Sequence, residues 1–333
     1  MKGSLLFLFV AYLLSSACQI NIGTEELTPN SEESLNWTWL KSRTTEKAQS
    51  RLVHQEVFGD GNKIRLLQSM SMFDNKAFCF NDGLYCYVFD IDSKIKYNTR
   101  DLPEESHHNN AQFLDIYYQE GDKYPLLLLS TGNYPPDQNE FYVVRVTENN
   151  GFIIFTKIKT IKNVLYEARN GGSWVADTKT GTLYMYAMTK SDWRVTGDNI
   201  FCVFSFDLPD LLDPSDVILQ YDDVKNYWEY SYLIHQGGTF YNGYLLFNVQ
   251  SLNTIGDVVL ESSYNVLAVN TRDGSIDAVL PLDVSLETEG ISVLNDKLYV
   301  SFKNGSPNQN ADDVMFKLIE YTLPKSIIKN LEE

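Results

Sequence analysis

Cationic residues are scarce in this chain, and it has no long apolar run beyond its first residues. Its 27 lysine and arginine residues face 44 aspartate and glutamate residues, so the formal net charge is −17 at pH 7. Phosphate backbones and anionic lipid surfaces are bound through basic patches, which this balance does not supply. The composition therefore predicts no nucleic-acid partner, and contact with a membrane only through an anchor.

Motifs that hold nucleotides or activate a serine are missing as well. The sequence contains no Gly-x-Ser-x-Gly elbow, no phosphate-binding loop and no dinucleotide-binding fingerprint. His108, His235 and Glu289 are residue types that bind zinc, but they lie too far apart in the sequence to form a recognised ligand spacing. We therefore predict no cofactor and no metal site.

The N-terminus has the pattern of a secretory signal. Lys2 precedes an apolar run over residues 5–14, and small residues follow up to Ala17. The run is too short to span a bilayer, so residues 1–17 are predicted to be a signal peptide. Residues 18–50 are polar and without periodicity, which predicts a flexible tether.

The small residues directly before Cys18 resemble the lipobox of bacterial lipoproteins, although Leu14 stands one position further from the cysteine than usual. The resemblance implies that Cys18 carries a lipid. It also implies that the protein is exported to the bacterial cell envelope, on the periplasmic side or at the surface. An ordinary signal peptide with an incidental cysteine is the alternative.

Three further cysteines remain after Cys18. Cys79 and Cys86 flank an Asp82-Gly83 pair, and a two-residue turn there would place the two cysteines directly opposite each other. Opposed residues on paired strands are close enough for a disulfide, which an exported protein can keep. We therefore predict a Cys79–Cys86 disulfide, with a reduced pair as the alternative; Cys202 is expected to be a buried apolar residue.

A short polar segment opens a strand five times along the chain. These segments begin the ranges 68–73, 108–113, 169–174, 235–240 and 288–293, and each leads into an aromatic or other apolar residue. Further strand patterns follow each one, so the chain is predicted to repeat a four-stranded unit five times. The spacings of 40, 61, 66 and 53 residues indicate insertions between strands.

The last unit has only three predicted strands, whereas an unassigned strand pattern, residues 53–58, precedes the first unit. An N-terminal strand that completes the last sheet would remove an open edge. We therefore predict an all-β fold, a β-propeller of five four-stranded blades over residues 51–323, followed by a tail over 324–333. Six blades and a pair of β-sandwiches are the alternatives.

In a propeller the first strand of each blade lines the central channel, so the five polar segments should meet at its mouth. Paired glycines at 171–172 and 237–238 would let the strands approach one another there. The candidate ligand-binding residues are Gln68, His108, Asn109, Arg169, Asn170, His235, Gln236 and Glu289. Crowding at the axis could by itself explain small and polar residues at these positions.

Amides and arginine form forked hydrogen bonds with hydroxyls and carboxylates, so this set suits a glycan or another small polar ligand. Catalysis is less well supported, because a glycosidase needs two acids at a defined separation and only Glu289 lies clearly at a strand opening. Asp115 and Asp177 come later in two other units. Aromatics in connecting segments, at Tyr134, Trp193 and 227–230, are candidate sugar platforms.

Two segments, residues 107–130 and 289–300, are similar to parts of secreted bacterial propeller proteins of largely uncharacterised function. The second is also similar to the inner strand of propellers related to the bacteriocin helveticin J. This resemblance implies fold and export but no catalytic residue. The leading interpretation is a lipid-anchored binding protein. A polysaccharide hydrolase or lyase using Glu289 with His108 or His235 is the alternative, and a scaffold for protein partners is a further one.

Overall fold

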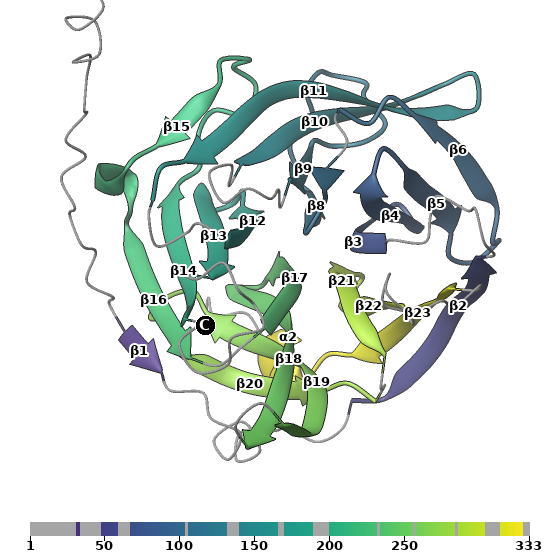
Figure 1. Ribbon diagram of the computed structural model, residues 1–333. Helices are drawn as coiled ribbons and strands as arrows, with labels where there is room; N and C mark the ends of the chain where they lie inside the picture. Colours follow the sequence, from purple (N-terminus) through teal and green to yellow (C-terminus); the bar gives the residue numbers. More distant parts are fainter. Residues whose placement is uncertain are drawn as a thin grey trace, which may run out of the picture.

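The computed structural model describes residues 31–33, 48–58, 67–103, 106–131, 140–165, 170–188, 200–231, 234–255, 258–283, 286–303 and 314–328. These residues form five four-stranded antiparallel blades arranged in a ring, a β-propeller, as Figure 1 shows. The predicted fold class and the five-bladed count are therefore confirmed for the described chain.

Each blade follows the chain from the axis of the ring outward. The first two blades are β3 (Leu67–Phe73), β4 (Lys76–Gly83), β5 (Cys86–Asp90) and β6 (Lys96–Arg100), then β8 (Ala111–Phe113), β9 (Leu127–Ser130), β10 (Glu140–Asn149) and β11 (Phe152–Asn163). The third is β12 (Asn170–Asp177), β13 (Thr182–Met188), β14 (Ile200–Asp207) and β16 (Asn226–Ser231). The fourth is β17 (Ile234–Tyr241), β18 (Tyr244–Ile255), β19 (Val258–Asn270) and β20 (Ile276–Pro281).

The fifth blade confirms the predicted ring closure. It consists of β21 (Glu287–Leu294), β22 (Lys297–Lys303), β23 (Val314–Thr322) and, on its outside, β2 (Ser50–Phe58). β2 pairs antiparallel with β23 from Ser50 opposite Tyr321 to Phe58 opposite Val314, and Figure 1 shows the purple N-terminal strand beside the yellow C-terminal one. Opening the ring therefore requires the loss of this whole ladder.

Short elements decorate the outer edges of the blades. β15 (Val217–Leu219) and β6 both pair in parallel with β11, so the first two blades are joined through their outer strands. β7 (Ser106–His107) pairs with the end of β4, and a 3₁₀ turn spans Tyr221–Asp223. β1 (Ser31–Glu33) pairs in parallel with β16, so three residues of the predicted tether carry regular structure.

The apolar core is divided into five clusters in the described part of the chain, one between each pair of neighbouring blades. Alternation along each strand sends successive side chains to the two faces of a blade, and each face packs against its own neighbour. α2 (Lys325–Ile328) adds Ile327 to the cluster between the fourth and fifth blades. The first residues of the predicted tail therefore belong to the packed structure.

The predicted disulfide is wrong, because the β4–β5 register differs from the expected one. Phe80, not Cys79, lies opposite Cys86, and the connection runs over residues 81–85. The one-residue shift places the two thiols on opposite faces of the blade, Cys79 toward the fifth and Cys86 toward the second. Both cysteines are buried and unbonded to each other, and Cys202 is buried as predicted.

No helix among the described residues is long and apolar enough to cross a membrane. The predicted signal peptide and Cys18 lie outside the described residues, as does most of the tether.

Candidate functional site

The innermost strands of the five blades all run in the same direction along the axis of the ring; they are β3, β8, β12, β17 and β21. Contacts between neighbouring inner strands advance in step. Gly290 lies against Met70, and two residues further along, the Met72 N–H donates to Ser292 Oγ over 3.1 Å. The Asn110 and Gln112 side chains likewise donate to the Trp174 and Ala176 carbonyls, and Gly237 lies beside the Glu289 carbonyl. All five strands therefore begin at one end of the ring, which we call the opening end, and finish at the other, the far end.

The strand openings approach closely at the opening end, as the paired glycines predicted. A Cβ atom on Gly237 would lie 2.9 Å from the Glu289 carbonyl oxygen and 3.6 Å from Asn110 Oδ1. A Cβ atom on Gly290 would lie 2.8 Å from the carbonyl carbon of Ser69. These contacts bring the openings of the first, second, fourth and fifth blades together.

Four of the five inner strands carry an irregular register at the same place, directly at the polar opening. The shifts fall between Leu67 and Ser69, Asn170 and Ser173, His235 and Gly237, and Thr288 and Gly290. The residues inside them include the predicted site residues Gln68, Gln236 and Glu289. A β-bulge turns its extra residue away from the regular alternation of the strand, which is why these polar side chains leave the blade faces.

Many of the polar groups at the opening end form hydrogen bonds that join neighbouring blades. Asn110 Nδ2 donates to the Trp174 carbonyl over 3.0 Å, while its Oδ1 accepts from the Gly238 N–H over 3.1 Å. Ser130 Oγ accepts from the Trp174 N–H over 3.1 Å. Buried backbone groups that face a neighbouring blade need such partners, so the architectural explanation accounts for part of the polar pattern.

Glu289 forms a buried ion pair that the sequence did not indicate. Its Oε1 lies 2.5 Å from Lys303 Nζ, and the two side chains are 1% and 5% exposed. Lys303 lies at the end of β22, and its Nζ also donates to the Leu67 carbonyl over 3.4 Å. The carboxylate is thus held between the fifth and first blades, with its charge balanced inside the protein.

Two other predicted site residues are buried at the same end. His108 is fully buried; its Nδ1 lies 3.4 Å from the Ser130 carbonyl oxygen, and its ring meets that of Phe80 edge-on. Gln68 is also buried. Full burial removes the His108 ring from direct contact with a ligand in this conformation, whereas Gln68 keeps 8% of its surface exposed.

The accessible polar groups at the opening end are neighbours of the buried ones. Asn109, Gln236 and Glu287 are each half-buried, and Gln236 Nε2 donates to Glu287 Oε1 over 3.1 Å across the fourth and fifth blades. Glu287 is not among the ligand-binding residues predicted from the sequence. Its place two residues earlier on the same strand gives it the exposure that Glu289 lacks.

The side chains of three predicted ligand-binding residues lie outside the described part of the structure. Arg169 lies outside the described residues, and for Asn170 and His235 the description covers the backbone in β12 and β17 but not the side chain. Among the described residues, no group of three or more His, Cys, Asp or Glu side chains is placed to share a metal ion.

The acids considered for a glycosidase do not gather with Glu289. Asp115 lies two residues beyond the end of β8 and Asp177 is the last residue of β12, so both lie at the other end of the ring. The predicted aromatic platform over 227–230 is also wrong, because Tyr227, Trp228 and Tyr230 belong to β16 and are buried in the core. Tyr134 and Trp193 lie outside the described residues.

Comparison with known proteins gives no family. No protein-family model matches the sequence, and no curated protein matches it. Among solved structures, glutaminyl cyclase from Myxococcus xanthus aligns with a TM-score of 0.41 and 9% identity, over 84% of this chain and 100% of the other. The GH43 endo-arabinanase from Bacillus licheniformis aligns with a TM-score of 0.41 and 12% identity, over 81% and 99%. At these TM-scores neither similarity supports a fold assignment, so the fold is assigned from the arrangement of the sheets.

Proposed function

We propose that this protein is an exported, lipid-anchored β-propeller that binds a glycan or another small polar ligand at the opening end, without catalysing a reaction. The observation that carries the proposal is the Gln236–Glu287 pair, which presents an amide and a carboxylate from adjacent blades at the rim of the axis. Asn109 adds a second half-buried amide at the same end. Amide and carboxylate groups together donate to and accept from hydroxyl groups, as a glycan requires.

The buried pair beneath supports binding over catalysis. A general acid or base must come within hydrogen-bond reach of the proton it transfers. Glu289 is 1% exposed and holds Lys303, so its carboxylate is occupied by a partner inside the protein. The alternative, a hydrolase or lyase using Glu289 with His108 or His235, would need this end of the ring to open.

A glycan array with the full-length protein tests the proposal, followed by Gln236→Ala and Glu287→Gln. We expect both variants to lose most of the signal for the glycan that binds, because each removes one half of the presented pair. Gln119→Ala and Glu120→Gln, both in an exposed segment at the far end, are the matched controls and should keep the signal. Release of new reducing ends from any polysaccharide by the wild-type protein would instead establish the enzyme.

Anchoring is tested separately, because it depends on residues 1–18. In a bacterial host, metabolic labelling with radioactive palmitate should label the full-length chain, and Cys18→Ser should abolish the label and release the protein from the membrane fraction. If the wild-type chain is not labelled, residues 1–17 are an ordinary signal peptide and Cys18 carries no lipid.

A further inference from the structure

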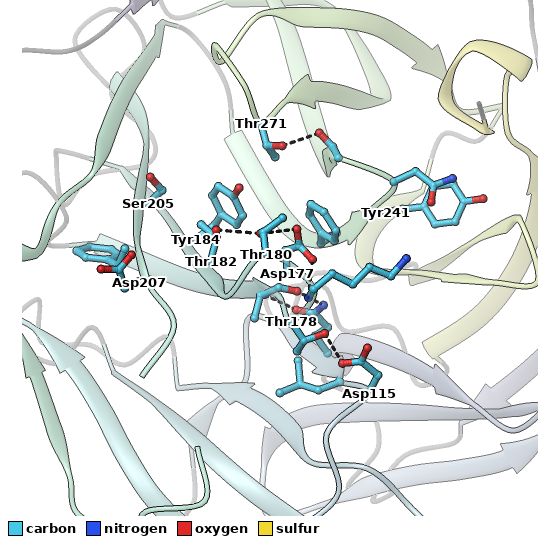
Figure 2. A pocket seen from close by; sticks show the side chains of 18 of the residues that line it. Asp115, Asp177, Thr178, Thr180, Thr182, Tyr184, Ser205, Asp207, Tyr241 and Thr271 are labelled. Carbon is cyan, nitrogen blue, oxygen red and sulfur yellow. Dashed lines mark hydrogen bonds between the residues drawn. The ribbon is translucent and has the colours of Figure 1, made fainter. Parts of the chain in front are cut away.

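A cavity of about 720 Å³ lies at the far end, between the second, third and fourth blades. Figure 2 shows hydrogen bonds that join carboxyl and hydroxyl groups in its wall, from Thr178 to Asp115 and from Thr180 to Asp177. Its walls come from the ends of β8, β12 and β17, the β12–β13 turn and the neighbouring strands of the third blade. Its volume lies within the range of roughly 300–1,000 Å³ that small-molecule sites occupy.

Two carboxylates in this cavity are held by hydrogen bonds rather than by cations. Asp177 is 7% exposed; it accepts from the Lys179 N–H over 3.0 Å and from Thr180 Oγ1 over 2.6 Å. Asp115 accepts from Thr178 Oγ1. Neither forms an ion pair with a lysine or arginine in the described chain. A carboxylate oxygen can accept more than one hydrogen bond, so both retain acceptor positions for a ligand.

Aromatic rings form another part of the wall. Phe240 is half-buried, and its ring lies parallel to that of Tyr184 from the adjacent blade, with centroids 6.3 Å apart and an interplanar angle of 8°. The face of an aromatic ring is electron-rich. It therefore attracts the polarised C–H groups on the apolar face of a sugar ring.

The charges around the cavity balance. Its lining contains three acids, Asp115, Asp177 and Asp207, and three cationic residues, Lys179, Lys225 and Arg272. The described acids do not form a metal-binding group, as stated above. A ligand with a large net charge would therefore gain little electrostatic free energy here, and the binding of a neutral ligand does not depend on such a gain.

We propose that the far-end cavity binds a neutral oligosaccharide, at a site separate from the one at the opening end. Asp177 and Asp115 accept hydrogen bonds from sugar hydroxyls, and Phe240 packs against the apolar face of one ring. The combination of carboxylate acceptors, aromatic face and balanced charge matches the chemistry of a neutral sugar, which carries many hydroxyls and no charge.

Isothermal titration of the full-length protein with cellotetraose, xylotetraose, mannotetraose, maltotetraose and arabinotetraose tests this. We expect one of the five to bind. Asp177→Asn should weaken that binding about tenfold or more, because it removes the charge and one acceptor of the hydrogen bonds. Phe240→Leu keeps the apolar volume but removes the ring face, and should weaken binding about fivefold.

Asp90→Asn is the matched control for Asp177→Asn. Asp90 lies in the first blade, outside the cavity, and accepts from the backbone N–H two residues on and the hydroxyl three residues on, as Asp177 does. It should leave binding unchanged.

Three results would overturn the proposal. The first is that none of the five sugars binds, and the second is that Asp90→Asn weakens binding as much as Asp177→Asn does. The third is that binding is lost in Gln236→Ala and Glu287→Gln but kept in the two cavity variants, which would leave only the opening-end function standing. Loss confined to the cavity variants supports the far-end site, and the opening-end site is then judged by its own variants on the glycan array.

Discussion

The two ends of the ring use similar polar residues in different ways. At the opening end, Glu289 and Lys303 neutralise each other in a buried pair, and the Asn110 side chain joins three blades. At the far end, Asp177 and Asp115 border an open cavity with hydrogen bonds from hydroxyl groups and no cationic partner in the described chain. Buried polar groups at the opening end mainly join the blades, whereas the two carboxylates at the far end line a cavity.

The close approach of the strands explains the difference. Where Gly237 and Gly290 bring neighbouring backbones into contact, the buried side chains of Asn110 and Glu289 bind partners within the protein. The far ends of β12 and β17 instead border the cavity, whose lining includes Asp115 and Asp177. Chemical variety in a sequence is thus a poor guide to a binding site unless the spacing of the strands is known.

The largest expected effect comes from breaking the buried pair. Lys303→Met leaves the Glu289 carboxylate buried and uncompensated, and should lower the free energy of unfolding by about 3–5 kcal/mol in urea denaturation. At the far end, Lys225→Met breaks an ion pair with Asp207 whose side chains are 54% and 82% exposed, and should cost less than about 1 kcal/mol.

The double variant Glu289→Gln with Lys303→Met tests the cause of that loss. Removing both charges removes the uncompensated one, so most of the stability should return. If the double variant is as unstable as Lys303→Met alone, or if the Lys225 and Lys303 variants lose equally, the contrast between the two ends is wrong.

The second effect concerns backbone contact at the axis. An Ala Cβ at position 290 would lie 2.6 Å from Met70 Cβ and 2.8 Å from the carbonyl carbon of Ser69, so Gly290→Ala should destabilise the protein by about 3 kcal/mol. Gly181, in the far-end turn, has φ +68° and no atom within 4 Å of such a Cβ. Gly181→Ala should cost only about 1 kcal/mol of backbone strain, measured by the same denaturation. Equal losses would show that the opening end is not crowded.

A smaller loss of stability is expected when the pH is lowered. It arises at the ring closure, between the two ends of the ring. Burial lowers the pKa of His54, which lies on β2 with its ring centroid 4.3 Å from that of Phe89. The unfolded chain then binds the proton more readily than the folded one, so stability should fall as the pH drops from about 7.5 through the ordinary histidine value of about 6.5. Thermal melts should show this loss in the wild type and in His107→Asn at the opening end, but a reduced loss in His54→Asn. An unchanged pH dependence in His54→Asn would remove His54 as its cause.

The smallest expected effect tests the β4–β5 register. This register decides which side chains of the hairpin lie on each face of the blade at the opening end. Because Cys79 and Cys86 are unbonded, adding a reductant should leave the melting temperature unchanged, whereas a disulfide would typically stabilise by about 2 kcal/mol or more. Burial raises the pKa of both thiols, so a thiol reagent should modify them only in guanidinium chloride. A melting temperature that drops on reduction would restore the predicted register.

The ring could be predicted from the sequence because its signals are local and repeated. Each polar opening precedes a strand pattern, and the spare strand around Val53 to Phe58 matched the strand missing from the fifth unit. The site could be predicted only in part. Lys303 lies on a second strand and reaches Glu289 because of the register shift between Thr288 and Gly290, and no residue pattern indicates such a shift.

The prediction of a disulfide between Cys79 and Cys86 was wrong for a related reason. The Asp82-Gly83 pair favoured a two-residue turn, but the hydrogen bonds between Asn81 and Tyr85 close a longer connection, and one residue of shift moves each thiol to the opposite face of the blade.

The sequence by itself determined the strands, their grouping in fours and the closure of the ring, because alternation and turn residues act over a few positions. Only the tertiary structure decided which polar groups are buried against each other and which border an open space. That depends on how closely strands from different blades approach, and residues distant in the chain set that distance.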